Sequence, residues 1–263
     1  MMPIYTTIGE HLVEFTSSSD RMLAMLAVHF PCHVPAEPLG KAPDLVIHIE
    51  AGYGVSFVDD EVTITEEPGR IRFRRADYLL VTDEAYREAR IFVFDELALK
   101  HALMNLYSAY IVHHGWGLLL HSSCVIADGR AHLFAGPSGA GKSTVAKLSH
   151  PRELLSDEAA LVKITPGHMT VFNSPFRSEL AATGREQSST LASVHLLYQA
   201  HSNRRIGLSK SEGLLQLLDK IFYWAHSPEE TRKVLHAVHV LAGTVPIYEL
   251  HFQQNNTFWE LIS

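Results

Sequence analysis

The chain has 263 residues, 46% of them hydrophobic, which is enough for one large domain or for one domain with a smaller lobe. Its formal net charge is −7 and its longest basic run is residues 72–75, so we expect no nucleic-acid partner. The two cysteines, Cys32 and Cys124, form no disulfide framework, and no apolar run approaches the ~18 residues of a membrane helix. We therefore expect a cytoplasmic protein without a signal peptide and without a membrane partner.

Residues 1–94 form the first predicted domain, a small strand-rich lobe. Apolar and polar residues alternate in two of its segments, and a Pro-Gly turn joins them. The expected strands are residues 44–50, 62–65, 71–74 and 89–94, and one helix is expected at residues 20–30. The lobe shows no phosphate, metal or nucleophile pattern. We expect an antiparallel lobe that docks a substrate or partner.

The second predicted domain, residues 95–263, begins with a long helix. Asp95 can cap this helix, and Leu99, Leu103, Leu106 and Tyr110 recur at helical spacing, which indicates a core stripe. Glycines at positions 115 and 117 end the helix. Two strands, residues 118–126 and 131–135, follow with a turn between them.

The C-terminal third alternates strands and helices. Strands are expected at residues 153–158, 195–199 and 246–252. Two helices have start signals: Ser209 pairs with Glu212 in a capping box, and a second capping box, Ser227 with Glu230, has Pro228 at the first helical position. Gly243 is expected to close the second of these helices.

The segment Gly136–Ser143 fits the phosphate-loop pattern G-x-x-x-x-G-K-[ST]. A short buried strand precedes it and a helix follows it, which is the context that the motif requires. Glycines let successive backbone N–H groups turn inward into an anion-binding nest. Lys142 would reach the terminal phosphates, and the Ser143 hydroxyl would ligate Mg²⁺. The residues expected to bind ATP are Gly136, Pro137, Ser138, Gly139, Ala140, Gly141, Lys142, Ser143 and Thr144.

Two acids at the end of the 153–158 strand are the expected second half of the Mg²⁺ site. Asp157 and Glu158 follow Ser143 by 14 and 15 residues, a gap that one helix and one turn fill. Acids at the end of a strand beside a phosphate loop commonly hold its metal. We therefore expect Ser143, Asp157 and Glu158 to bind the metal.

Two further residues are candidates for the chemistry. His121 lies one strand upstream of the loop strand, and a hairpin brings it to the loop only if the register of the two strands allows it. Arg177 follows the acid strand in an expected loop. It could stabilise transferring phosphate charge or hold the phosphoacceptor; the alternative is a solvent-exposed loop arginine.

His121, the loop Gly136–Ser143 and the acids Asp157 and Glu158 occur in an order and spacing that resemble the HPr kinase/phosphorylase catalytic domain. The resemblance covers about residues 95–165. It implies an α/β fold, with a phosphoenolpyruvate carboxykinase-like P-loop domain beside the strand-rich lobe. It also implies that His121 assists an acidic base, while Asp157 and Glu158 share the base and Mg²⁺ roles. Glu158 departs from the aspartate of that family.

The glycine- and arginine-rich signature that HPr kinases carry after the acids is not visible, so HPr is not the implied substrate. The chain looks more like HPr-kinase-related proteins found with ribosomally made peptides, among them lasso-peptide precursor kinases. This resemblance implies an ATP- and Mg²⁺-dependent kinase with catalytic residues His121, Asp157, Glu158, Lys142 and Arg177, acting on a serine of a peptide. A kinase for free serine and a nucleotide-gated binding module without phosphotransfer stay open, as does a homo-oligomer.

Overall fold

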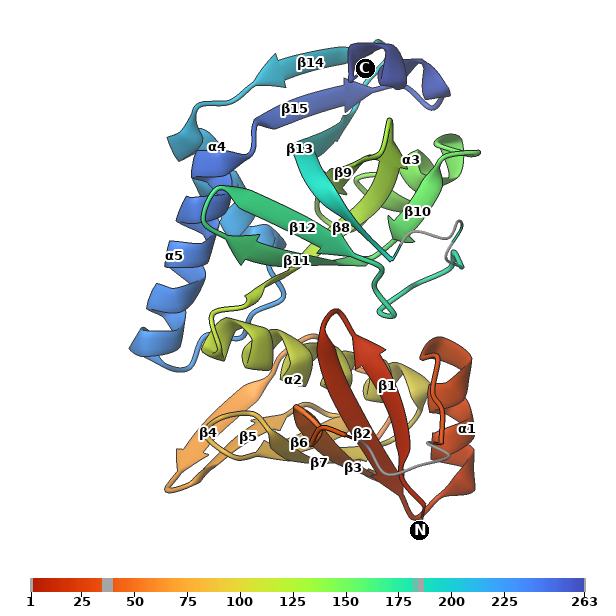
Figure 1. Cartoon of the computed structure of the whole chain (residues 1–263), viewed down its shortest axis with the longest axis vertical. Coiled ribbons are helices and arrows are strands. Elements are labelled where there is room, and N and C mark those ends of the chain that lie inside the picture. The colour runs from red at the N-terminus through yellow and green to blue at the C-terminus, as the bar shows by residue number, and fades with distance from the viewer. Residues whose placement is uncertain (1, 35–39, 182, 184–186, 263) are drawn as a thin grey trace. The chain divides into compact units, whose positions relative to one another are not determined.

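The computed structural model describes residues 2–34, 40–181, 183 and 187–262. The chain divides into two units, whose elements are labelled in Figure 1. The first unit holds Met1–His114 with Trp224–His226, and the second holds Gly115–Tyr223 with Ser227–Ser263. The long helix α2 (Glu96–His113) therefore belongs to the first unit, because it packs on the strands β6 and β7 of that unit. The sequence had grouped this helix with the phosphate loop.

A seven-stranded sheet forms the first unit, in the order β1-β2-β3-β7-β6-β5-β4. Its strands are β1 (Ile4–Ile8), β2 (His11–Ser17), β3 (Leu45–Ala51), β4 (Thr63–Glu67), β5 (Arg70–Arg74), β6 (Tyr78–Thr82) and β7 (Glu88–Val93). The pairs β2–β3 and β3–β7 are parallel, so the expectation of an antiparallel lobe is wrong for the middle of this sheet. Helix α1 (Asp20–His29) packs on β2 and β3.

Local signals placed helix α2 and four strands of the first unit, β3, β4, β5 and β7. The Asp95 carboxylate accepts a hydrogen bond from the Ala98 N–H at 2.9 Å, which confirms the predicted N-cap of α2. All four residues of the predicted stripe on this helix are buried. Strands β1, β2 and β6 were not predicted, although buried and half-buried residues alternate without interruption in β2 and β6.

Two long strands organise the eight-stranded sheet of the second unit, because each pairs with different strands along its length. Residues 117–121 of β8 (Gly117–Ala127) pair with β11, and residues 122–127 pair with β9. In the same way β13 (Ser188–Gln199) pairs first with β12 and then with β9. Strands β8, β11, β12, β13 and β9 thus close into a ring. The other strands are β9 (Arg130–Ala135), β10 (Glu153–Ser156), β11 (Ala159–Thr165), β12 (His168–Phe172), β14 (Arg204–Gly207) and β15 (Ile247–Phe252).

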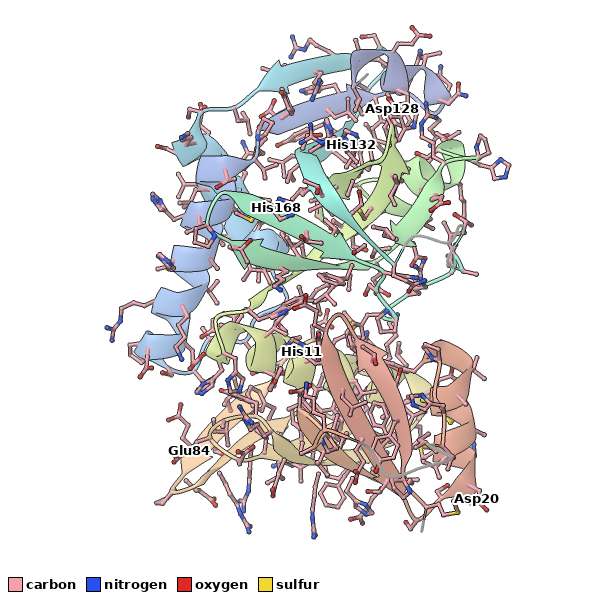
Figure 2. The ribbon with its side chains drawn as sticks, in the orientation of Figure 1. His11, Asp20, Glu84, Asp128, His132 and His168 are labelled. Atoms are coloured by element: carbon pink, nitrogen blue, oxygen red, sulfur yellow. The ribbon has the colours of Figure 1, made fainter. Side chains whose placement is uncertain are left out.

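Strand β9 lies between β8, to which it is antiparallel, and β13, to which it is parallel. Figure 2 labels Asp128 at the turn into this strand and His132 within it. Helix α3 (Lys142–Leu148) packs on β8 and β9 over an apolar cluster. The buried members of that cluster are Val125, Phe134, Val145, Ala146, Leu154, Leu197, Leu250, Phe252, Phe258 and Trp259.

The remaining helices begin where the sequence predicted. Ser209 and Glu212 form a reciprocal capping box at α4 (Lys210–Leu217). Ser227 accepts hydrogen bonds from the N–H groups of Glu229 and Glu230 at the start of α5 (Pro228–Thr244). The predicted end at Gly243 is wrong, since α5 continues to Thr244.

Two short 3₁₀ turns, η1 (Leu218–Lys220) and η2 (Asn256–Leu261), complete the set of described elements. None of the helices in the described part of the chain combines the length and the apolar character that a membrane span needs.

Candidate active site

The loop between β9 and α3 has the backbone that its glycines predict. Gly139 and Gly141 have φ angles of 79° and 106°, in the left-handed region where side chains are strained. A Cβ atom on Gly141 would also lie 2.6 Å from the Cζ atom of Phe252, a core ring. Glycine is therefore required at position 141 both by conformation and by space.

Lys142 is folded against the loop itself. Its Nζ atom donates hydrogen bonds to the carbonyl oxygens of Gly136 and Pro137, at 2.9 and 3.0 Å, and its residue is only 8% exposed. Burial lowers the pKa of the ammonium, the Glu158 carboxylate opposes this, and the positive charge of Lys220 adds to it. The Lys142 ammonium and the Glu158 carboxylate thus attract each other electrostatically.

The register of three strands brings the sequence-distant candidates to one place. Ser122 on β8 pairs with Ala135, the last residue of β9 before the loop. One residue earlier, His121 pairs with Ala159 on β11. The Ser122 N–H also donates to the Glu158 carbonyl oxygen at 2.9 Å. His121 and the acids therefore lie at the end of β9 from which the phosphate loop departs.

A cavity of about 300 Å³ opens at this place. The residues that line it are His121, Ser138, Gly139, Gly141, Lys142, Ser143, Thr144, Asp157, Glu158, Ser178 and Gln199. Among the predicted catalytic residues, it brings together His121, Lys142, Asp157 and Glu158. Gly136, Pro137 and Ala140 face a second cavity on the loop, together with Ser138 and Gly139.

Asp157 is buried, with 1% of its surface exposed. Its carboxylate accepts hydrogen bonds from three consecutive backbone N–H groups, those of Ser178, Glu179 and Leu180, at 3.1, 2.8 and 2.8 Å. A carboxylate offers about four lone-pair sites, so one remains for another ligand. Asp157 thus holds the 178–180 segment against the site.

Glu158 is only half-buried, in contrast to its neighbour. Its carboxylate is the charge that raises the pKa of Lys142 against the effect of burial. Of the two acids, Glu158 is therefore the one that is accessible from solvent.

His121 has a shifted pKa of about 4. Burial is the main cause, and the positive charges of Lys142 and Lys220 lower the pKa further. Its ring packs on Phe222, with 5.2 Å between the ring centroids. The imidazole is consequently neutral at pH 7, with one nitrogen that can accept a proton.

Arg177 does not line the cavity. Its guanidinium donates to the carbonyl oxygens of Leu155 and Leu180, at 2.9 and 3.3 Å, and to the Oδ1 atom of Asn173 at 2.6 Å. It neither faces the phosphate loop nor extends into solvent, because buried backbone carbonyls of β10 and the following loop need these donors. These bonds brace the 173–180 segment, and the predicted catalytic role of Arg177 stays a prediction.

Sequence reasoning missed two residues of the cavity. Gln199 ends β13 and donates from its Nε2 atom to the Gly139 carbonyl oxygen at 2.7 Å. Its position was foreseeable only from the parallel pairing of β13 with β9, since the carboxyl ends of parallel strands share one sheet edge. Ser178 lines the cavity because its backbone N–H donates a hydrogen bond to the Asp157 carboxylate. No motif marks either residue.

Strand β9, the glycine loop and helix α3 define a mixed α/β domain with a phosphate loop, and the two acids lie in the link between β10 and β11, because the expected strand 153–158 ends at Ser156. The model of the family described as "SynChlorMet cassette protein ScmC" matches residues 91–263, and the chain belongs to this family. The chain is also similar to the Hpr(Ser) kinase/phosphatase from Coxiella burnetii, with 9% identity and a TM-score of 0.29. That match covers 54% of this chain and 90% of the other. No curated protein matches the chain.

We predict that Lys142→Ala lowers the affinity for Mg²⁺-ATP at least about tenfold, because it removes the ammonium that the motif directs to the β- and γ-phosphates. Calorimetric titration measures this. Lys147→Ala, on the exposed face of the same helix, is the matched control and should bind ATP like the unaltered protein. Equal affinities of the two variants for Mg²⁺-ATP would contradict a role of the loop lysine in ATP binding.

We predict that Asp157→Asn lowers the free energy of unfolding by on the order of 2 kcal/mol, because an amide cannot accept all three backbone hydrogen bonds. Urea unfolding measures the loss. Glu158→Gln is the control, and its stability should stay within about 0.5 kcal/mol of the unaltered protein. If both variants were equally stable, Asp157 would not organise the 178–180 segment.

We predict that the His121 imidazole titrates with a midpoint near pH 4 and stays neutral from pH 6 to 8. In Lys142→Met the midpoint should rise, because a cation that disfavours imidazolium has been removed. Histidine-selective NMR across a pH series measures both. A midpoint at the ordinary value of about 6.5 would contradict the burial of this ring beside two cations.

Proposed function

We propose that this protein is an ATP-dependent serine kinase that transfers the γ-phosphoryl group of ATP to a serine hydroxyl of a peptide, and that this peptide is a ribosomally made precursor. The observation that carries the proposal is the single cavity that joins Lys142 and Ser143 of the phosphate loop to His121 and two acids. Phosphoryl transfer needs phosphate binding, a metal and a proton acceptor at one place. The cavity offers side chains of all three kinds.

The oxygen ligands of this cavity fit Mg²⁺. The Ser143 hydroxyl and the remaining lone pair of Asp157 are hard donors, and Mg²⁺ is held by one or two carboxylates together with phosphate oxygens and waters. Among the described residues no three His, Cys, Asp or Glu side chains form a metal cluster, so a dedicated all-protein cage is not the arrangement here. Bound Mg²⁺ would neutralise charge on the phosphates.

The roles of the two acids follow from their surroundings. Three backbone N–H groups occupy most of the Asp157 carboxylate, which suits it to hold the loop and a metal. Glu158 is accessible and is assigned as the base that takes the proton of the serine hydroxyl. The neutral imidazole of His121 lies at the same sheet edge and can accept a hydrogen bond from that hydroxyl.

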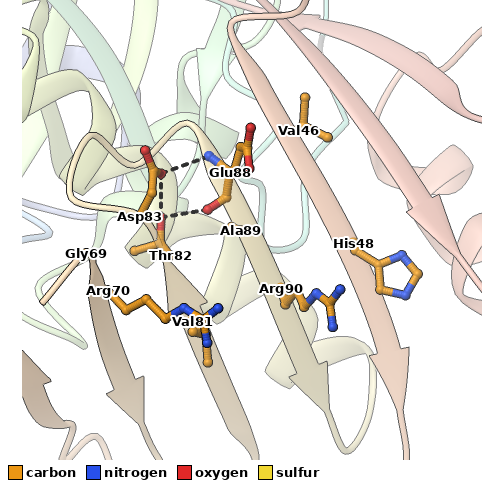
Figure 3. Close-up of a pocket in the computed structure, with 10 residues that line it drawn as sticks. All are labelled: Val46, His48, Gly69, Arg70, Val81, Thr82, Asp83, Glu88, Ala89 and Arg90. Atoms are coloured by element: carbon orange, nitrogen blue, oxygen red, sulfur yellow. Dashed lines mark hydrogen bonds between the residues drawn. The ribbon is translucent and has the colours of Figure 1, made fainter. Parts of the chain in front are cut away.

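The peptide is proposed to dock on the first unit. The outer edge of β1 is bonded to His33, through the Tyr5 N–H at 2.9 Å, whereas β4 pairs with no described strand beyond β5. An extended peptide can add to such an edge. On the same sheet a hollow of about 540 Å³ carries the side chains of Arg70 and Arg90, as Figure 3 shows. These guanidiniums can pair with peptide carboxylates.

We predict that incubation with Mg²⁺-ATP adds one phosphate to a serine of a flexible peptide. The reason is that a disordered segment can place its hydroxyl in the cavity at modest ordering cost. Mass spectrometry of parallel mixtures with a serine-containing peptide panel, folded HPr or free serine measures the outcome. Glu158→Gln is the control and should leave the peptides unmodified.

Phosphate only on HPr or only on free serine would contradict the peptide acceptor and leave the kinase assignment intact. ATP binding without transfer to any of the three would favour a nucleotide-gated binding module instead.

A further inference from the structure

The sequence predicted two cations at the kinase site, Lys142 and Arg177, and only Lys142 lines the cavity. Charge spreads over the oxygens of a transferring phosphoryl group, and kinases and related enzymes stabilise it with cations besides the loop lysine. Arg177 was the sequence candidate, and its guanidinium is bound to backbone carbonyls and Asn173. Among the described residues that line the cavity with the acids, Lys142 is the only lysine or arginine, so a second cation would have to come from a neighbouring element.

The two residues that follow the 3₁₀ turn η1 pair with β8 at the two positions before His121. Ile221 bridges to Leu120, and the Phe222 N–H donates to the Leu119 carbonyl oxygen at 2.9 Å. Phe222 then packs on the His121 ring. Lys220, the residue that precedes this bridge, is thus held next to the catalytic end of the sheet by backbone bonds.

Lys220 also lines a second cavity, of about 710 Å³, which residues of the phosphate loop line as well. The residues that line this cavity are 135–140, 196–199, 215, 216, 219 and 220. The cavity shares Ser138, Gly139 and Gln199 with the smaller cavity that holds the acids. The two cavities therefore meet along the loop.

The Lys220 side chain is charged and nearly buried. It is 12% exposed, and its ammonium donates to the Asp219 carboxylate at 2.5 Å. An ammonium has three donors, so it can keep this bond and still bind a phosphate oxygen. Burial is the main reason that the pKa values of Lys142 and His121 are lowered, and the Lys220 charge lowers both further, so its field reaches the site.

We propose that Lys220 is a catalytic residue of this kinase, whose ammonium binds the γ-phosphoryl group opposite Lys142 and stabilises the charge of its transfer. The inference rests on the proposed function. In the step, the serine oxygen forms a bond to the γ-phosphorus while the bond from that phosphorus to the β–γ bridging oxygen breaks. Glu158 takes the hydroxyl proton, ADP leaves with the electron pair, and Lys220 stays protonated.

The test uses the full chain with Lys220→Gln, Lys220→Arg and the control Lys210→Gln. Lys210 begins α4 on the same segment and is exposed. Calorimetry measures the affinity for Mg²⁺-ATP and for Mg²⁺-ADP, which lacks the γ-phosphate. Mass spectrometry measures transfer to a serine peptide that the unaltered protein modifies, and thermal unfolding checks that each variant is folded.

We expect Lys220→Gln to lower the affinity for Mg²⁺-ATP at least about fivefold and to leave the affinity for Mg²⁺-ADP within about twofold. The rate of phosphoryl transfer should fall on the order of 10²-fold. Lys220→Arg should recover most of both losses, because the guanidinium keeps the charge. Equal losses for ATP and ADP, or an effect no larger than that of Lys210→Gln, would overturn the proposal. A folded Lys220→Gln variant that weakens ATP but not ADP supports it even if no acceptor is found. An unaltered protein that binds neither nucleotide would overturn both this inference and the proposed function.

Discussion

The register of strand β8 is the constraint on which the site depends. Up to His121 this strand pairs with β11, and from Ser122 onward it pairs with β9. The change of partner occurs at the level where β9 ends and the phosphate loop begins. A slip of one residue would turn His121 to the other face of the sheet and move it away from the loop. The pairing of one long strand first with β11 and then with β9 therefore places His121 beside the loop between β9 and α3.

The second organising interaction is the buried carboxylate of Asp157. Removing a carboxylate from water is costly unless it is well hydrogen-bonded, and three backbone N–H groups meet that demand. These hydrogen bonds also shape the site, because they bring Ser178 to the cavity. Adjacent acids consequently differ in their surroundings: one is enclosed by backbone donors and the other is accessible. Such a difference is how neighbouring carboxylates acquire separate roles.

Charge–charge interactions link the ionisable side chains of the site to one another. Lys142 and Lys220 both act on His121, which burial and these charges keep in the neutral form. Phosphate binding would add negative charge near the same ring, so the protonation of His121 is coupled to the occupancy of the loop. The Glu158 carboxylate acts in the opposite sense on Lys142. Under the proposed function, the protonation of His121 would therefore respond to a bound nucleotide.

The phosphate loop, the caps of three helices and most strand positions could be predicted from the sequence, because glycine conformation, capping and alternation depend on neighbouring residues. Tertiary structure alone decided which segments meet. The approach of His121 depends on register, the bonds of Arg177 depend on the approach of its loop to the Leu155 carbonyl of β10, and the position of Gln199 depends on parallel pairing. These contacts join residues far apart in the chain, and their free energy exists only once the sheets have closed.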